Sequence, residues 1–334
     1  MGDMINKSII NMTQLSETRN AKLHLNNETT QVIRLKNTSL HFPLLPEGVT
    51  LNKEGGKTII SVTNNAPKDL LFIYEINAQS NVTEEFSLLV EGAKIHLHTI
   101  FMSGEEGNVI HQENNQKSLQ ENEEKYHLFR EIHAKKESMV TLTSVQDTPS
   151  YLFISKDTDL FIEESANLSE TTLILASGKV VEKTRAFLCG RNAHLVRKEG
   201  SITDRYIEQE TVISHLAENT TANVVSKSFV EAKGEWMGKS TIKAETIAKN
   251  TVSFIRNDAI LLDKEARAKT IPALEIKAED VQVGHASSVS HISTETLFYL
   301  QTRGLTKDEA RETLKKGFLQ SYLSSFPVGL IEEK

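Results

Sequence analysis

The sequence is poor in cysteine, in aromatic residues and in positive charge. Cys189 is the only cysteine among 334 residues, so this chain alone forms no intrachain disulfide and no thiolate metal site. Aromatic residues make up 6% of the sequence, which argues against ring-lined grooves for sugars or single-stranded nucleic acid. The net charge of −7 argues against nucleic-acid binding, because phosphate backbones need clustered lysine and arginine.

Long apolar runs and a targeting signal are also missing. No stretch approaches the ~18 apolar residues of a membrane span. The first residues, Met1-Gly-Asp-Met-Ile-Asn-Lys7, lack the apolar core and cleavage site of a secretory signal. We therefore expect a soluble, cytoplasmic protein that does not bind a membrane.

A phosphate-binding loop is absent as well. The segment Gly234-Glu-Trp-Met-Gly-Lys-Ser240 has three residues between its glycines, whereas the phosphate loop has four and leads into a helix. The residues after Ser240 instead have an extended pattern. Any ATP chemistry is therefore expected in a partner.

The clearest positive signal is a repeat of roughly 28 residues. Similar segments begin 28, 27, 29 and 28 residues apart, at Ser138, Ala166, Ala193, Ala222 and Asn250. A second apolar segment follows halfway through the intervals, at Val180, Ile207 and Trp236. Two short strands per repeat of this length indicate a solenoid, since propeller blades need about 40 residues. We predict a mainly β fold, a right-handed parallel β-helix with a small C-terminal α-helical domain. A β-sandwich with evenly spaced strands is the alternative.

The patterns divide the chain into three parts. A polar N-terminal arm is predicted over residues 1–30 and the β-helix core over residues 31–292. Within the core, the Gln-, Asn- and Glu-rich stretch 104–127 has little to bury and is predicted to be a surface excursion. The helical domain is predicted over residues 293–334.

The helical domain is predicted from a change of periodicity after Ser293. A short helix is expected to end at Gly304, a residue suited to the left-handed closing position. Thr306-Lys-Asp-Glu309 has capping-box spacing and predicts a second helix. Two helices after an open-ended β-helix either cap its exposed strand edge or bind a partner, and the residues alone leave both open.

His285 is the most distinctive candidate for chemistry. It lies between the last strand-like segment and the helices, and Gly284 and small residues flank it. On chemistry alone, a structural histidine and a ligand are both open. Asp258 and Asp263 are isolated acids and Trp236 is the only tryptophan. A β-helix carbohydrate-active enzyme or sugar-binding protein would carry clustered acids on successive turns and exposed aromatic residues, so these isolated residues argue against it, and it is kept as the alternative function.

Two runs in the C-terminal stretch, with the histidine between them, are specific enough to compare with known families. They are Pro272-Ala-Leu-Glu-Ile-Lys-Ala-Glu-Asp-Val281, His285 and Leu297-Phe-Tyr-Leu-Gln-Thr-Arg-Gly-Leu-Thr-Lys-Asp-Glu-Ala310. In this order and spacing they resemble the SufB/SufD family of iron–sulfur cluster assembly proteins. The resemblance is strongest over residues 250–325. It implies a parallel β-helix that pairs with a SufB-like subunit through its end and docks a SufC-like ABC ATPase through its C-terminal helices.

The resemblance also implies a division of roles between subunits. Asn257 stands where SufB-type subunits carry a cysteine, and Ala286 where they carry a glutamate, whereas His285 matches a histidine of SufD-type subunits. It therefore implies a SufD-type scaffold subunit that is not an enzyme, with His285 as a candidate metal ligand at the interface. No cofactor is expected to bind the isolated chain stably, and a nascent iron–sulfur cluster would be shared with the partner. A homodimeric scaffold is a further alternative.

The partner-binding residues that the resemblance implies all lie in the two predicted helices and their connection. They are Leu297, Phe298, Tyr299, Leu300, Arg303, Gly304, Leu305, Ala310, Leu314 and Phe318.

Overall fold

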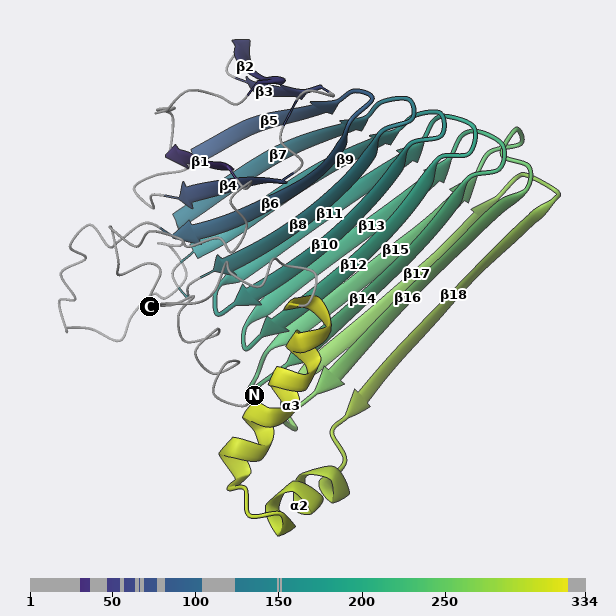
Figure 1. Ribbon diagram of the computed structural model, residues 1–334. Coiled ribbons are helices and arrows are strands. Elements are labelled where there is room, and N and C mark those ends of the chain that lie inside the picture. The colour runs from purple at the N-terminus through teal and green to yellow at the C-terminus, as the bar shows by residue number, and fades with distance from the viewer. Residues whose placement is uncertain are drawn as a thin grey trace.

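The computed structural model describes residues 31–36, 47–54, 57–63, 66, 69–76, 82–103, 124–148, 150 and 152–323. In this part of the chain, the strands wind into a parallel β-solenoid of about 7 turns, and two helices follow it (Figure 1). The predicted fold class, a parallel β-helix with C-terminal helices, is confirmed. The β-sandwich alternative is wrong, because the strands of successive turns pair in parallel.

The described strands form two sheets of nine strands each, and from β3 onward consecutive strands lie in opposite sheets. Sheet A contains, in spatial order, β1 (Gln31–Lys36), β4 (Asp69–Ile76), β6 (Lys94–Ser103), β8 (Met139–Thr148), β10 (Asn167–Ala176), β12 (His194–Thr203), β14 (Thr221–Val230), β16 (Thr251–Leu261) and β18 (Val281–His291). Sheet B contains β2 (Val49–Glu54), β3 (Lys57–Val62), β5 (Val82–Val90), β7 (Glu124–Ala134), β9 (Leu152–Ile162), β11 (Lys179–Leu188), β13 (Tyr206–His215), β15 (Glu235–Ala244) and β17 (Arg267–Ile276). Only β2 and β3 pair antiparallel among these strands.

The core lies between the two sheets and is built from columns of stacked side chains. Along β9 every second residue is buried, so one set of side chains points inward and the other toward solvent. Because the turns pair in parallel and in register, an inward side chain stacks on the equivalent one of the next turn. One such column contains Ile154, Val180, Ile207 and Trp236, all buried.

One corner of the solenoid explains why the repeat is visible in the sequence. At this corner a residue one or two positions before the sheet A strand has a positive φ of 55° to 60° in six successive turns, at Gly92, Glu137, Ser165, Asn192, Asn219 and Asn250. Glycine and asparagine adopt this conformation more readily than other residues do. A small buried residue follows each of them, as Ala166 follows Ser165.

The predicted alignment of the repeats slips in its last two intervals. His194 pairs with Thr221 after 27 residues, and Thr221 pairs with Val252 after 31. Thr220, and not Ala222, is therefore the equivalent of Ala193. The last interval has four more residues than the one before it, two in the corner between β14 and β15 and two in the corner between β15 and β16, so the strands themselves keep their register.

The two described helices are α2 (Thr294–Thr302) and α3 (Lys307–Leu323). Ser293 caps α2, since its hydroxyl accepts a hydrogen bond from the Thr296 amide at 3.1 Å. The predicted capping box of α3 is confirmed. The Thr306 amide donates to Glu309 Oε2 at 2.8 Å, and the Glu309 amide donates to Thr306 Oγ1 at 3.3 Å.

Parts of the predicted layout lie outside the described residues, namely the arm over 1–30, the excursion from 104 to 123 and the last residues from 324. The predicted end of the excursion is wrong, because residues 124–127 belong to β7. Neither described helix has the length and apolar character that crossing a membrane requires.

Candidate functional site

No residue that the structure describes covers the C-terminal end of the solenoid. We call β17 and β18 the open end, because each is the last strand of its sheet within the described chain. Leu274 on β17 stacks over Ile242 and is 39% exposed, whereas Ile242 is fully buried. Val289 on β18 stacks over Ala259 and is 45% exposed, whereas Ala259 is 1% exposed. The apolar core therefore continues into the last turn, and no residue that the structure describes covers it there.

His285 lies on this open end and belongs to an inward column of sheet A. It pairs with Ile255, which is buried and stacks on Val224. The imidazole is exposed and has no hydrogen bond to another residue that the structure describes. His285 is thus placed at the rim of the interior, where a second chain covering the open end would contact it.

Asn257 lies one turn below the rim and is 3% exposed. Its amide donates a hydrogen bond to Ser240 Oγ at 2.9 Å, which links sheet A to sheet B across the interior. Ser287 stacks directly over Asn257. Ala286, between His285 and Ser287, has the opposite orientation in the strand. Asn257 is therefore a brace between the sheets, and neither Asn257 nor Ala286 adds a metal donor beside the imidazole.

The donors of this chain do not make a complete metal site. No group of three or more His, Cys, Asp or Glu side chains is arranged around a metal position in the described part. Cys189 follows β11, which lies three strands away from β17 in sheet B. Partial burial, aided by Glu163, raises the pKa of its thiol, so the reactive thiolate is disfavoured. An iron–sulfur cluster needs several sulfur ligands, and one imidazole does not fit that requirement without a partner.

The structure separates the predicted partner-binding residues into two groups. In α2, which has no buried residue, Phe298 is 65% and Tyr299 is 56% exposed. Arg303 lies over the Tyr299 ring and is also exposed. In α3, by contrast, Ala310 is buried and Phe318 packs against the solenoid. The exposed members are Phe298, Tyr299, Arg303 and Gly304, and Leu297, Leu300, Leu305 and Leu314 are partly buried.

The two isolated aspartates are occupied by ion pairs. Asp258 contacts Arg256 at 2.7 Å and accepts a hydrogen bond from Ser288. Asp263 binds Arg311 of α3. Both carboxylates are therefore used within the chain.

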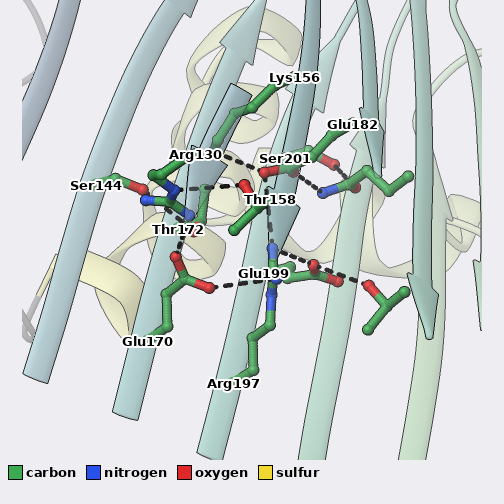
Figure 2. Close-up of polar contacts among 12 residues, drawn as sticks. Arg130, Ser144, Lys156, Thr158, Glu170, Thr172, Glu182, Arg197, Glu199 and Ser201 are labelled. Atoms are coloured by element: carbon green, nitrogen blue, oxygen red, sulfur yellow. Dashed lines mark hydrogen bonds and ion pairs between the residues drawn. The ribbon is translucent and has the colours of Figure 1, made fainter. Parts of the chain in front are cut away.

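Sequence reasoning missed a cluster of charged side chains inside the solenoid. Among the described residues, six such side chains are each at most 5% exposed and point toward one another between the sheets (Figure 2). We call them the ionic core; they are Arg130, Lys156, Glu170, Glu182, Arg197 and Glu199. The sequence carries a sign of this cluster, because Lys156 lies an even number of residues from Ile154 and Leu160 along β9 and therefore faces inward with them.

Arg197 is the centre of the ionic core. Its Nη1 lies 3.2 Å from Glu170 Oε2, and its Nη2 lies 2.8 Å from Glu199 Oε1. Arg130 Nη2 donates to Glu170 Oε1 at 2.5 Å, and Lys156 Nζ lies 2.7 Å from Glu182 Oε1. Three positive and three negative groups thus balance inside the solenoid, as buried charges require.

The ionic core also shifts the acidity of its own groups. Burial raises the pKa of Glu182, but the positive charges of Lys156 and Arg197 outweigh burial and hold that pKa at about 2. Burial likewise raises the pKa of Glu199, and Arg197 offsets only part of this effect. Burial lowers the pKa of Arg197, and the surrounding carboxylates reverse this and raise it. The network is therefore stable only while all its members are present.

Comparison with known proteins identifies the family. Residues 86–318 match the SufBD core domain, described as SUF system FeS cluster assembly, and this match covers more than half of the chain. The chain belongs to the SufBD family. The resemblance found in the C-terminal stretch is thereby confirmed at the level of the family.

Curated SufBD relatives give the same assignment. The chain is 34% identical to an iron–sulfur cluster assembly SufBD family protein of Mycobacterium bovis over 125 residues, which are 37% of this chain and 15% of the relative. It is 29% identical to such a protein of Pyrococcus horikoshii over 206 residues, or 61% of this chain and 46% of the relative. It is 28% identical to one of Staphylococcus epidermidis over 206 residues, or 59% and 43%. The match spans less than half of each relative, and the SufD-type assignment stays a prediction.

Proposed function

We propose that this SufBD chain is a non-catalytic scaffold subunit of an iron–sulfur cluster assembly complex. Membership of the family supports the process. The observation that carries the scaffold role is the open end, where an uncovered apolar core surrounds a single histidine. An apolar core that is exposed at its end gains stability when a second chain covers it.

The proposed partner at the open end is a second β-solenoid of the SufB-like type. Within the described chain, the outer edges of β17 and β18 carry unpaired backbone groups. Edge strands of this kind pair readily with another chain. A solenoid end offers both backbone partners and an apolar layer to cover Leu274, Ile276 and Val289. A SufB-like subunit would also supply the thiolates that this chain lacks at its own end.

In the proposed complex, the nascent cluster is the substrate and His285 contributes one ligand. A neutral imidazole binds iron through one ring nitrogen. The Asn257–Ser240 bond holds the two sheets together below the rim. His285 is thereby fixed at the boundary between the two subunits, and the partner completes the ligand set.

The proposed partner at the C-terminal helices is a SufC-like ABC ATPase, which docks on α2. Phe298 and Tyr299 are large aromatic side chains that stay more than half exposed, although Arg303 lies over the Tyr299 ring. ATP hydrolysis is assigned to the partner, because the segment that resembles a phosphate loop is part of β15. There Lys239 is paired with Glu208 and Ser240 with Asn257.

The test replaces His285 in the full chain, co-expressed with a cysteine-bearing SufBD paralogue and the ATPase. His285→Ala should leave assembly of the complex unchanged and lower the yield of iron–sulfur cluster. His291→Ala is the matched control, since His291 is an exposed histidine on the same strand with the same parity. Equal cluster yields from both variants and the wild type would remove His285 from the site.

A further inference from the structure

Helix α3 is attached to the solenoid by one stripe of side chains. The stripe consists of Arg311, Lys315, Phe318 and Tyr322, which share one face of the helix. Tyr322 is 3% exposed, and its hydroxyl donates to the Glu199 carbonyl at 3.2 Å. Its ring lies against Gly200, where a Cβ would come within 3.0 Å of the ring atoms. Figure 1 shows α3 against sheet A, whereas α2 projects beyond the ends of the strands.

The first contact of the stripe is a two-pronged ion pair. Arg311 Nη1 donates to Asp263 Oδ1 at 3.0 Å, and Nη2 donates to Oδ2 at 2.7 Å. The two side chains are 21% and 24% exposed, so solvent screens the pair only in part. Hydrogen bonds from Arg311 are the main reason that the pKa of Asp263 is lowered. A bidentate pair of this kind fixes direction as well as distance.

Asp263 also holds two corners of the solenoid together. Its Oδ2 accepts a hydrogen bond from the amide of Ala232 at 2.6 Å, and Ala232 belongs to the corner after β14. Asp263 itself lies in the corner between β16 and β17. One carboxylate thus joins two successive corners and the start of α3.

The location of this pair relates the two ends of the proposed assembly. Arg311 lies in the first turns of α3, a few residues after α2 ends at Thr302. Asp263 lies just before β17, the edge strand of sheet B at the open end. The pair therefore connects the start of α3, the helix that follows α2, to the corner that leads into the open end.

A second ion pair on the same helix provides a comparison. Lys315 lies 2.9 Å from Glu231, which is in the corner after β14, one turn further from the open end. This pair attaches α3 to the solenoid but does not touch the corner before β17. If an ion pair fixes the direction of α3 relative to the open end, it should therefore be the pair of Arg311 and Asp263.

We propose that Arg311 and Asp263 are positioning residues, which fix the direction of α2 relative to the open end. The inference rests on the proposed function, since α2 is the docking surface for one partner and the open end the pairing surface for the other. Held by this pair, the two surfaces keep one relative orientation. Without it, α3 stays attached through Lys315, Phe318 and Tyr322, and α2 swings about the start of α3.

The test measures the distance between α2 and β17 in the isolated full chain by electron–electron double resonance. Spin labels are placed at Gln301→Cys and Lys269→Cys, both exposed positions, in a Cys189→Ser background. Arg311→Gln should turn one narrow distance distribution into a broad one, and Arg311→Lys should give an intermediate width. Lys315→Gln is the matched control and should leave the distribution narrow.

Two results would overturn the inference: an unchanged distribution in Arg311→Gln, or equal broadening in Lys315→Gln. Arg311→Gln keeps the Asp263–Ala232 hydrogen bond, so the corner stays intact, and the far-ultraviolet circular dichroism spectrum checks the fold. Because the measurement needs no partner, its outcome does not depend on the proposed function. If the distances behave as expected but the chain binds neither a SufBD paralogue nor the ATPase, the proposed function fails while the positioning role stands.

Discussion

The middle of the solenoid and its open end are built from the same repeat but are finished differently. In the middle, the charges of the ionic core are neutralised within the chain, and columns such as Ile154 to Trp236 are closed above and below. At the open end, Leu274 and Val289 continue such columns and are left exposed, beside His285. Side chains in the middle are therefore satisfied by their own chain, whereas the last turn leaves apolar side chains that no described residue covers, which is the basis for proposing the open end as an interface.

The largest effect is expected from breaking the ionic core. Arg197→Ala leaves the carboxylates of Glu170 and Glu199 buried without their shared partner, so the free energy of unfolding should fall by about 3–5 kcal/mol. Denaturant unfolding measured by circular dichroism checks this value. Arg256→Ala is the control, because Arg256 is 53% exposed in its pair with Asp258 and should cost at most about 1 kcal/mol. Similar losses in both variants would show that the ionic core is not a distinct stabilising region.

The next effect concerns a histidine buried in the middle, His215, as a counterpart to the exposed His285. Burial lowers the pKa of His215 to about 4. Its Nδ1 lies 2.9 Å from Thr220 Oγ1, which itself donates to the Ala217 carbonyl. Nδ1 therefore carries the proton and the neutral ring is the bound form.

Because the folded pKa of His215 lies below the unfolded one, its neutral form stabilises the fold at pH 7. This contribution is lost as the pH falls from about 6.5 toward 4, and amounts to about 3 kcal/mol at the acid end. His215→Gln should therefore flatten this part of the curve of unfolding free energy against pH, relative to the wild type. Parallel curves for the wild type and His215→Gln would contradict the assignment.

A charge at the open end should affect pairing without affecting the fold. Leu274→Lys adds charge to a side chain that is already 39% exposed, so the unfolding free energy of the isolated chain should change by less than about 0.5 kcal/mol. Binding to the second solenoid, measured by light scattering after size exclusion, should be lost. Ile242→Lys, one turn below in the same column, should unfold the chain. Intact pairing by Leu274→Lys would move the interface elsewhere.

The smallest effect on the isolated chain is expected on α2, where the double variant Phe298→Ser and Tyr299→Ser removes exposed side chains only. Its unfolding free energy should match the wild type within about 0.5 kcal/mol. Its binding to the ATPase, measured by calorimetry, should weaken, while pairing at the open end is unchanged. Glu295→Gln on the same helix is the control. Unaltered ATPase binding would place the docking surface outside α2.

The fold could be predicted because its corners constrain residue type. One corner of each turn, before the sheet A strand, needs a left-handed residue and a small buried one after it, and these requirements recur often enough to be visible as a period. The helix ends were predictable for the same reason, since the Thr306–Glu309 pair satisfies backbone groups locally. The prediction at Ala222 is two residues too late, because the interval from Ala193 to Thr220 keeps the 27-residue spacing and the extra residues lie in the corners of the next turn.

The ionic core and the orientation of His285 depend on register, which the sequence alone does not display. The alternation of β9 indicates that Lys156 faces inward, but its partner Glu182 follows only from the offset at which β9 and β11 pair. His285 faces inward because it stacks on Ile255. The predicted partner-binding residues likewise fall into two groups that only the packing on sheet A distinguishes: Phe318 packs against the sheet, and Phe298 stays exposed.

Hydrogen exchange of the backbone amides in β17 and β18 shows directly whether the open end is the pairing surface. In the isolated chain these edge strands should exchange faster than β9 and β11, which are paired on both sides. On addition of the SufB-like solenoid, protection should rise in β17 and β18 and stay unchanged in β9 and β11. Protection that rises in another part of the chain while β17 and β18 still exchange rapidly would contradict the assignment of the open end as the pairing surface.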